Sequence, residues 1–333
     1  MKRIFIKLFI VTILISCSKD DSSNEVIDER MGDSAITNIY ASGKVSEQTA
    51  AEAKQTIFGK WDVGGSSSKN NLSSKNSTSC EFNFIEFTDK SYIMNLSIDF
   101  GSGGPESGSI FGDYELVEVD GLVTEVRLYF SVLGSNEHIA TLTNIEVVEK
   151  ASGGFDATFD INFVIDLEDI NIICSGLDGN YSADKEPAME ETLSAGVDTN
   201  HYKVVRSWKL TSYSDSDGYD LASSLLEFCE IETYNSETGE YTYSIDPDCV
   251  PPAAFQVNLS TFGTYVTMLV DDSGSPLQVQ TGTWTWSNSD QTEFIVDDDW
   301  TGTISNLTLS TWEFSSIEEG GDLTASYGLT VIP

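Results

Sequence analysis

The residues of this 333-residue chain that could do catalytic chemistry are few. The two histidines, His138 and His201, are far apart in the sequence, and neither stands at a motif spacing from a nucleophile. The sequence contains neither a G-x-S-x-G nor an H-E-x-x-H motif. Glycosidases use a pair of carboxylates, but the 54 acidic residues of this chain allow a great many such pairs, so the sequence identifies no glycosidase site. We therefore expect a protein that is not an enzyme and has no catalytic residues.

Two acidic loops could offer oxygen ligands to calcium. Asp215 and Asp217 alternate with other residues before Gly218, and residues 297–299 are consecutive aspartates. The first loop lacks the glutamate that closes an EF-hand, so a solvated loop is the simpler interpretation, and Asp215 and Asp217 are kept as calcium candidates. The sequence has no C-x-x-C pair, which argues against zinc. We expect no other cofactor.

Four tryptophans in the second half of the chain could form a binding platform. Trp284 and Trp286 share one face of an expected strand, and Trp300 and Trp312 follow nearby in sequence. On the outer face of a sheet such rings would stack against sugars or contact a partner, whereas on the inner face they would fill the core. Both interpretations stay open at the level of the sequence.

Composition and charge restrict the class of protein. Hydrophobic residues make up 40% of the chain and aromatic residues 11%, which indicates folded structure, and abundant Ser, Thr, Val, Tyr and Phe favour strands. The formal net charge of −37 is spread along the sequence. Such a surface repels phosphate backbones, so we expect no nucleic-acid partner. Solubility or divalent-cation binding would explain the charge.

Alternation of apolar and polar residues predicts antiparallel strands in both halves of the chain. The clearest examples are residues 92–100 and 155–165. Further strands are expected at residues 80–87, 114–119, 125–132 and 138–148 and, in the second half, at 255–259, 263–270, 282–286, 293–296, 303–314 and 323–331. Sequential strands joined by hairpin turns predict an all-β fold of two small antiparallel up-and-down β-barrels or sandwiches.

Each half opens on a tryptophan strand. In residues 57–63 and again in residues 204–210, two apolar residues lead through two others to Trp61 and Trp208. Because both strands begin a similar series, the sequence indicates a weak internal repeat. We expect Trp61 and Trp208 to plug the floors of the two barrels.

A short helix is expected before each tryptophan strand. Residues 45–56 contain good helix formers, with Ser46 as the expected N-cap. Residues 185–193 have Pro187 in the first turn, where a proline is tolerated. The order of parts, helix and then tryptophan strand, therefore repeats.

The N-terminus has the parts of a secretory signal. Residues 1–16 begin with Lys2 and Arg3 and continue through an apolar run that is too short to span a membrane as a helix. The last residues of this run together with Cys17 read Leu-Ile-Ser-Cys, which resembles the lipobox of bacterial lipoproteins. That resemblance implies cleavage before Cys17 and lipidation of Cys17, which would anchor the chain to a membrane.

The residues after Cys17 give the expected location. Residues 18–21, Ser-Lys-Asp-Asp, resemble the surface-export signal that lipoproteins of one Gram-negative phylum carry just past the lipid. The resemblance implies an outer-membrane protein that faces the cell exterior. Residues 17–43 have few large apolar groups, and we expect them to be a disordered tether because they cannot bury enough surface to offset the entropy of ordering.

Several short motifs resemble the lipocalin-like domains of secreted bacterial lipoproteins. They are G-K-W at residues 59–61, R-S-W at 206–208, F-G-T-Y at 262–265 and G-T-W-T-W at 282–286. The resemblance covers about residues 45–175 and 200–333, and the second half fits better. It implies a small barrel closed by a short helix, and it implies no single function.

Apart from Cys17, the chain has four cysteines. Cys80 and Cys174 fall in the first expected domain, and Cys229 and Cys249 fall in the second. In an exported chain oxidation is favoured, so the pairing that respects the domains joins Cys80 with Cys174 and Cys229 with Cys249. Free thiols are the alternative.

These inferences combine into a plan for the whole chain. We expect a signal peptide at 1–16, a tether at 17–43, a barrel at 44–180, a linker with a short helix at 181–200 and a second barrel at 201–333. The leading functional hypothesis is a non-enzymatic surface lipoprotein that binds or presents a small apolar ligand or a glycan. The alternative is a structural or protein-interaction module with an outer-membrane protein as partner, and a carbohydrate hydrolase ranks third. An interior cavity would favour the first hypothesis, and filled barrels the second.

Overall fold

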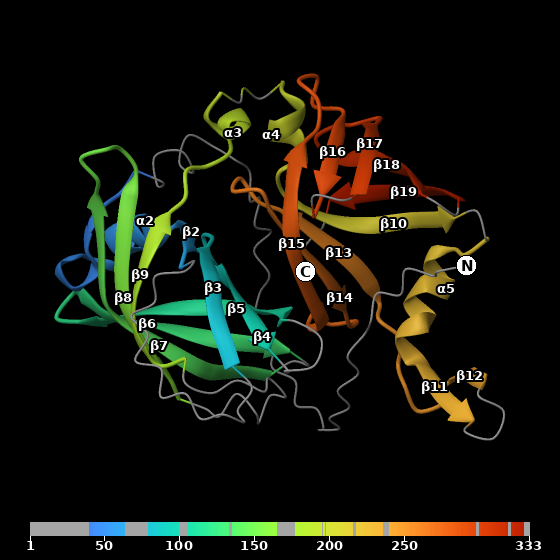
Figure 1. Ribbon diagram of the computed structural model, residues 1–333, viewed down its shortest axis with the longest axis horizontal. Coiled ribbons are helices and arrows are strands. Elements are labelled where there is room, and N and C mark those ends of the chain that lie inside the picture. Colours follow the sequence, from blue (N-terminus) through green and yellow to red (C-terminus); the bar gives the residue numbers. More distant parts are fainter. Residues whose placement is uncertain are drawn as a thin grey trace.

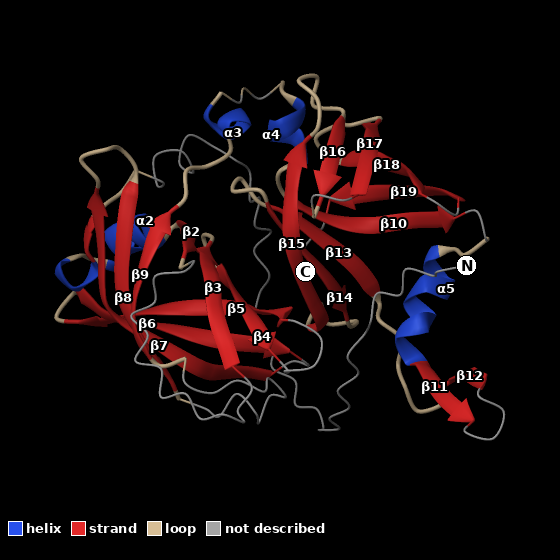
Figure 2. Cartoon of the chain, in the orientation of Figure 1, coloured by secondary structure: helices blue, strands red, loops and turns tan. Residues whose placement is uncertain are grey.

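The computed structural model describes residues 40–63, 79–99, 105–132, 135–164, 177–194, 196, 198–215, 218–235, 240–297, 300–318 and 321–329. Within them the protein is all-β and contains two closed barrels, each of eight antiparallel strands (Figures 1 and 2). The predicted fold class is therefore confirmed, and the short helices lie at the ends and sides of the barrels.

The first barrel is an up-and-down barrel in which each strand pairs with the next along the chain and the last strand pairs with the first. Its strands are β2 (Gly59–Asp62), β3 (Ser79–Phe87), β4 (Ser91–Asp99), β5 (Pro105–Val119), β6 (Leu122–Val132), β7 (Ser135–Glu149), β8 (Phe155–Phe163) and β9 (Gly179–Lys185). A two-residue strand, β1 (Gly43–Lys44), adds to the edge of β7. Closure leaves the eight main strands without a long free edge.

The centre of the first barrel is filled by large side chains. Trp61 is fully buried, and its ring lies 5.2 Å from that of Phe87 and 5.5 Å from that of Phe159, measured between centroids. Phe159 in turn stacks on Tyr181 of β9 at 5.7 Å. Strands from opposite parts of the sequence thus meet in one aromatic cluster, as expected for a small barrel filled by its own residues. Trp61 therefore belongs to the core of the first barrel, and its place at the floor stays a prediction.

Strand β9 extends the first barrel beyond residue 180, into the stretch expected to be a linker. It pairs along its whole length with β8, and its last two residues, Asp184 and Lys185, pair with β2 to close the barrel. The buried positions are Tyr181, Ala183 and Lys185. Two of these inner positions hold a small residue, Ala183, and a lysine, Lys185, so the sequence lacks the apolar alternation that would have predicted this strand. The helix expected from residue 185 begins later, at α3 (Glu190–Leu193), after Pro187.

The helix before the first barrel has a different N-cap from the expected one. A 3-10 turn, η1 (Val45–Glu47), contains Ser46, and the α-helix α2 (Ala50–Ile57) follows it. Thr49 is the N-cap: Glu52 accepts hydrogen bonds from the Thr49 backbone N–H at 3.0 Å and from its hydroxyl at 2.9 Å. A Thr-x-x-Glu capping box therefore fixes the start of the helix. Ser46 was the wrong choice because the chain turns once more before the helix begins.

The second barrel has the same up-and-down order. Its strands are β10 (Ser207–Asp215), β13 (Ala254–Leu259), β14 (Thr264–Val270), β15 (Pro276–Trp286), β16 (Glu293–Val296), β17 (Trp300–Ser305), β18 (Thr311–Glu318) and β19 (Gly321–Leu329). The single strand expected at residues 303–314 is two strands. Asn306 adopts a positive φ of 51°, and the Thr308 hydroxyl accepts a hydrogen bond from the Thr311 N–H at 2.9 Å. This turn reverses the chain between β17 and β18.

A short helix, α4 (Asn200–Val204), leads into the second barrel. Thr199 caps it by accepting a hydrogen bond from the Tyr202 N–H at 3.2 Å. Trp208 is fully buried, and its Nε1–H donates to the Val204 carbonyl at 2.7 Å. The second tryptophan strand therefore lies against its helix, so each barrel is preceded by a short helix, as predicted.

The two barrels pack against each other through outward-facing residues of β4, β5 and β13–β15. The shared apolar cluster contains Ile93, Ala254, Val266, Met268 and Val270, with Phe84, Phe111 and Val279 at its margin. A polar contact continues it, because the Asn95 Nδ2 donates to the Thr281 hydroxyl at 3.4 Å. This contact explains why consecutive residues of β4 are buried: one set faces the barrel interior and the other faces the second barrel.

Candidate functional site

The tryptophans considered as a platform line the interior of the second barrel. Trp284, Trp286 and Trp312 are buried, and Trp300 is half-buried with its ring 4.8 Å from that of Phe314. Trp312 stacks on Tyr327 at 4.3 Å and meets Trp208 edge-on at 5.8 Å. The interpretation as an exposed platform is therefore wrong. Their alternate positions on strands of a closed barrel turn these rings inward, where they contribute to the core.

His201 belongs to this core and has a structural role. Its Nδ1 accepts a hydrogen bond from Trp286 Nε1–H at 3.0 Å, and its Nε2 lies 2.7 Å from the Thr192 hydroxyl, which donates to the Thr261 carbonyl at 3.2 Å. These partners require the neutral imidazole with its proton on Nε2. Burial lowers the pKa of His201 to about 4. The network ties α3 and α4 to the second barrel.

An excursion of the chain interrupts the second barrel between its first two strands. It contains α5 (Leu221–Leu226), a 3-10 turn η3 (Glu227–Cys229) and the hairpin strands β11 (Glu230–Asn235) and β12 (Glu240–Ile245). The hairpin forms a two-stranded sheet that is separate from both barrel sheets, and Figure 1 shows it projecting beyond the second barrel. It therefore adds surface without adding to either barrel core.

Four contacts fix the two ends of the excursion. Asp220 caps α5 by accepting a hydrogen bond from the Ser223 N–H at 2.8 Å, and Leu221 packs against the core of the second barrel. At the other end, a disulfide joins Cys229 to Cys249 and so closes the base of the hairpin. The Asp246 N–H donates to the Cys229 carbonyl at 2.8 Å across the same base.

One of the two disulfides expected from the sequence is therefore present, between Cys229 and Cys249. Cys174 lies outside the described residues, so the pairing of Cys80 with it stays a prediction. Residues 1–39, which include Cys17 and most of the expected tether, also lie outside the described part of the chain. The end of the expected tether is described, and Gly43 already belongs to β1.

One face of the hairpin is aromatic and exposed to solvent. The register pairs Tyr234 with Tyr241 and Glu232 with Tyr243, which places all four on the same face. The rings of Tyr234 and Tyr241 lie 4.8 Å apart, and the Tyr243 hydroxyl donates to Glu232 at 2.9 Å. The exposed fractions are 55% for Tyr234, 57% for Tyr241 and 48% for Tyr243. We call this surface the tyrosine face; it also includes Glu230 and Ile245, which pair directly.

A run of exposed aromatic rings at this density is unusual on a surface that only needs to be soluble. Tyrosine is also the residue type that contact surfaces favour, because it buries a large area and loses little side-chain entropy. An isolated two-stranded hairpin is marginally stable in water, and the disulfide at its base stabilises the folded face. The tyrosine face is therefore the strongest candidate site in the described part of the chain.

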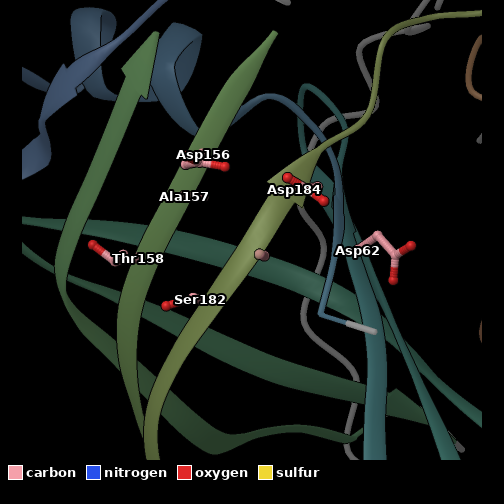
Figure 3. A pocket seen from close by; sticks show the side chains of 7 residues that line it. Asp62, Asp156, Ala157, Thr158, Ser182 and Asp184 are labelled. Atoms are coloured by element: carbon pink, nitrogen blue, oxygen red, sulfur yellow. The ribbon is translucent and has the colours of Figure 1, made fainter. Parts of the chain in front are cut away.

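A second surface feature is a polar hollow on the first barrel with a volume of about 290 Å³. Figure 3 shows it where β8, β9 and the end of β2 meet, lined by Asp62, Asp156, Ala157, Thr158, Ser182, Ala183 and Asp184. The ammonium of Lys150 lies 3.2 Å from Asp156 and also pairs with Asp184, whose pKa it lowers. The lysine neutralises part of the acidic charge, so the hollow is a poor cation site.

Of the two calcium candidates, Asp215 lies among the described residues. The Asp215 carboxylate accepts a hydrogen bond from the Tyr219 N–H at 2.9 Å and so holds the turn before α5. Asp217 lies outside the described residues. Among the residues that are described, no group of three or more His, Cys, Asp or Glu side chains could hold a metal ion. In the same part of the chain, no helix combines the length and apolar character that crossing a membrane requires.

Comparisons with known proteins do not place the chain in a family. No family model matches it, and no curated protein matches it. Among solved structures, it is similar to a protein of unknown function from the DUF3598 family of Nostoc punctiforme. The identity is 13%, with 82% of this chain and 96% of that chain covered, and the TM-score is 0.15. A likeness at this TM-score carries no argument.

The seam between the barrels contains a buried acid, Glu86 of β3. Burial raises the pKa of its carboxyl group, while the hydroxyls of Thr264 and Ser260 and the charge of Lys60 act in the opposite direction. Lys60 itself forms an ion pair with Glu186 at 3.1 Å. The carboxyl group of Glu86 is thus buried where the two barrels meet.

Sequence reasoning missed the hairpin, although the signal was present. In residues 241–245 Tyr241, Tyr243 and Ile245 alternate with two small hydroxyl residues, and the stretch 230–245 is flanked by Cys229 and Cys249. The matching positions of the first strand hold Glu230 and Glu232, so no continuous apolar face marks the two strands as part of a core. A search for paired strands between two cysteines of the same domain would have found it.

Proposed function

We propose that this chain is a non-enzymatic binding protein that contacts another protein through the tyrosine face, with the two barrels as a rigid support. The observation that carries the proposal is the disulfide-closed hairpin, which exposes Tyr234, Tyr241 and Tyr243 on one side. Exposed aromatic clusters of this kind are typical of contact surfaces.

The filled barrels support the same proposal. In the part of the chain that the structure describes, aromatic residues occupy the barrel centres where a carrier of apolar ligands would hold its cargo. A small apolar ligand is therefore the weaker hypothesis, and the interaction module becomes the leading one. The barrel contact buries an apolar cluster centred on Ile93, Val266 and Met268, which supports the two barrels acting as one body.

Anchoring at the outer membrane completes the proposal. The Leu-Ile-Ser-Cys sequence that ends at Cys17 supports lipidation, and the acidic residues just after it support export to the cell surface. Replacing Cys17 by Ser should release the protein from the membrane fraction and remove the acyl mass from its N-terminal peptide. An acylated, membrane-bound Cys17→Ser protein would refute this part of the proposal.

Photo-crosslinking in the producing cell tests the proposed contact. We expect a photoreactive phenylalanine analogue in place of Tyr241 to give discrete crosslinked protein products. The same analogue at Tyr40 is a matched control. Tyr40 is 56% exposed, and its ring lies 6.4 Å from that of Phe155 in the first barrel, away from the hairpin in sequence and in sheet. Equal products at both positions, or none at Tyr241, would contradict the proposal.

A further inference from the structure

The charge around the tyrosine face restricts what can bind there. Glu230 and Glu232 lie on the face itself, next to the exposed rings. Asp246 and Asp248 lie at the base of the hairpin, where the Asp246 carboxylate accepts a hydrogen bond from the Asp248 N–H at 2.9 Å. Lys209 is the last basic residue of the sequence, so the whole excursion and every later strand contain no lysine, arginine or histidine. The tyrosine face therefore offers negative charge and aromatic rings, and its own segment of the chain supplies no basic residue.

This combination suits a cationic partner. A guanidinium or ammonium group is attracted to the face of a tyrosine ring, and the attraction adds to that of a neighbouring carboxylate. Arginine has the closer fit, because its planar group can stack on a ring and pair with a carboxylate at the same time. On the tyrosine face, Tyr243 and Glu232 already lie within hydrogen-bond distance of each other, so one side chain of a partner could reach both.

We propose that the tyrosine face binds an arginine- or lysine-bearing segment of another protein. The inference rests on the proposed function and names its partner class. The arginine and lysine side chains of the segment lie over Tyr234, Tyr241 and Tyr243, and their charges pair with Glu230 and Glu232. A neutral glycan would use the same rings but would not need the carboxylates, which makes it a distinct outcome of the test.

The general acidity of the protein complicates such a test, because a cationic peptide is attracted to any part of a chain with a net charge of −37. Substitution of tyrosine by alanine removes a ring and leaves the net charge unchanged. The double variant Tyr241→Ala and Tyr243→Ala therefore separates binding at the tyrosine face from general attraction. Tyr40→Ala removes an equally exposed ring elsewhere and serves as the control.

The measurement is fluorescence anisotropy of a labelled peptide with alternating arginine and glycine, titrated with the full chain in about 150 mM salt, where long-range attraction is screened. We expect saturable binding, weakened at least tenfold by the double alanine variant and unchanged by Tyr40→Ala. The variant Glu232→Gln should weaken binding about threefold and reduce its salt dependence. Tyrosine-to-phenylalanine variants at positions 241 and 243 should keep most of the affinity, since the rings remain.

Two results would overturn the inference. One is arginine-peptide binding that does not exceed that of a serine-for-arginine peptide. The other is binding that the double alanine variant leaves unchanged. Binding of a neutral oligosaccharide that depends on the tyrosines, and not on Glu232, would replace the inference by the glycan alternative. If Tyr241 crosslinks to a protein in cells while the arginine peptide fails to bind, the proposed function stands and only the partner class is wrong.

Discussion

The disulfide between Cys229 and Cys249 should stabilise the hairpin and leave the barrels almost untouched. It joins residues that are 20 positions apart, and in the chain-entropy model a loop of this length is worth about 3 kcal/mol. The hairpin pairs with neither barrel sheet, and a two-stranded sheet alone is only marginally stable. Replacing both cysteines by serine should therefore raise the unfolded-to-folded ratio of the hairpin about 100-fold, since 1.4 kcal/mol is a factor of ten.

Two probes can follow the two parts separately. All six tryptophans belong to the barrels, at positions 61, 208, 284, 286, 300 and 312. Thermal unfolding followed by tryptophan fluorescence should therefore give the variant a melting temperature within about 3 °C of the wild type. A shift of this size corresponds to less than about 1 kcal/mol. Hydrogen exchange at the amides of β11 and β12 should accelerate about 100-fold in the same variant. Retained protection in the hairpin, or a large drop in the tryptophan melting temperature, would refute this reasoning.

Two further predictions concern buried titratable groups. His201→Gln should cost about 2 kcal/mol at pH 7.5 by breaking the bonds to Trp286 and Thr192. Because burial lowers the pKa of His201 to about 4, its contribution to stability is complete above pH 6.5 and is lost as the pH falls toward 4. Denaturant unfolding should therefore show the difference narrowing over that range, and a constant difference would count against the buried neutral imidazole. The pKa of Glu86 is raised in the folded protein, so its contribution is present below pH 4.5 and lost as the pH rises through the folded value. Glu86→Gln, which resembles the protonated acid, should match the wild type near pH 4 and become the more stable protein at higher pH; a difference independent of pH would show that Glu86 is not buried as described.

The strands that carry the barrel cores could be predicted from the sequence because their alternation is strong. In β4, Tyr92, Met94 and Leu96 all face inward, and the pattern is visible in the sequence alone. Strand β9 was missed because Ala183 and Lys185 occupy its inner positions. Apolar alternation identifies a buried face only where the buried residues are themselves large and apolar.

The candidate site was harder to predict, for a related reason. The four tryptophans at positions 284, 286, 300 and 312 were considered as a platform because alternation in one sequence shows which residues share a face of a strand. It does not show which of the two faces points into the barrel. The exposed tyrosines of β11 and β12 attracted none, because Tyr234, Tyr241 and Tyr243 bury no core and so leave no apolar pattern. The tryptophans face inward because the barrel closes through distant strands, whereas the tyrosines stay exposed because their hairpin pairs with neither barrel sheet.

A chain without the hairpin gives the most direct test of the central claim that partner binding belongs to the tyrosine face. The disulfide holds the Cα atoms of Cys229 and Cys249 5.6 Å apart, so a short glycine-serine link can replace residues 230–248 and leave Leu221 in place. The account predicts barrels with wild-type tryptophan fluorescence and melting, together with loss of at least tenfold in affinity for the protein that crosslinks at Tyr241. Full affinity in the shortened chain would contradict the account and would place the contact surface on the barrels.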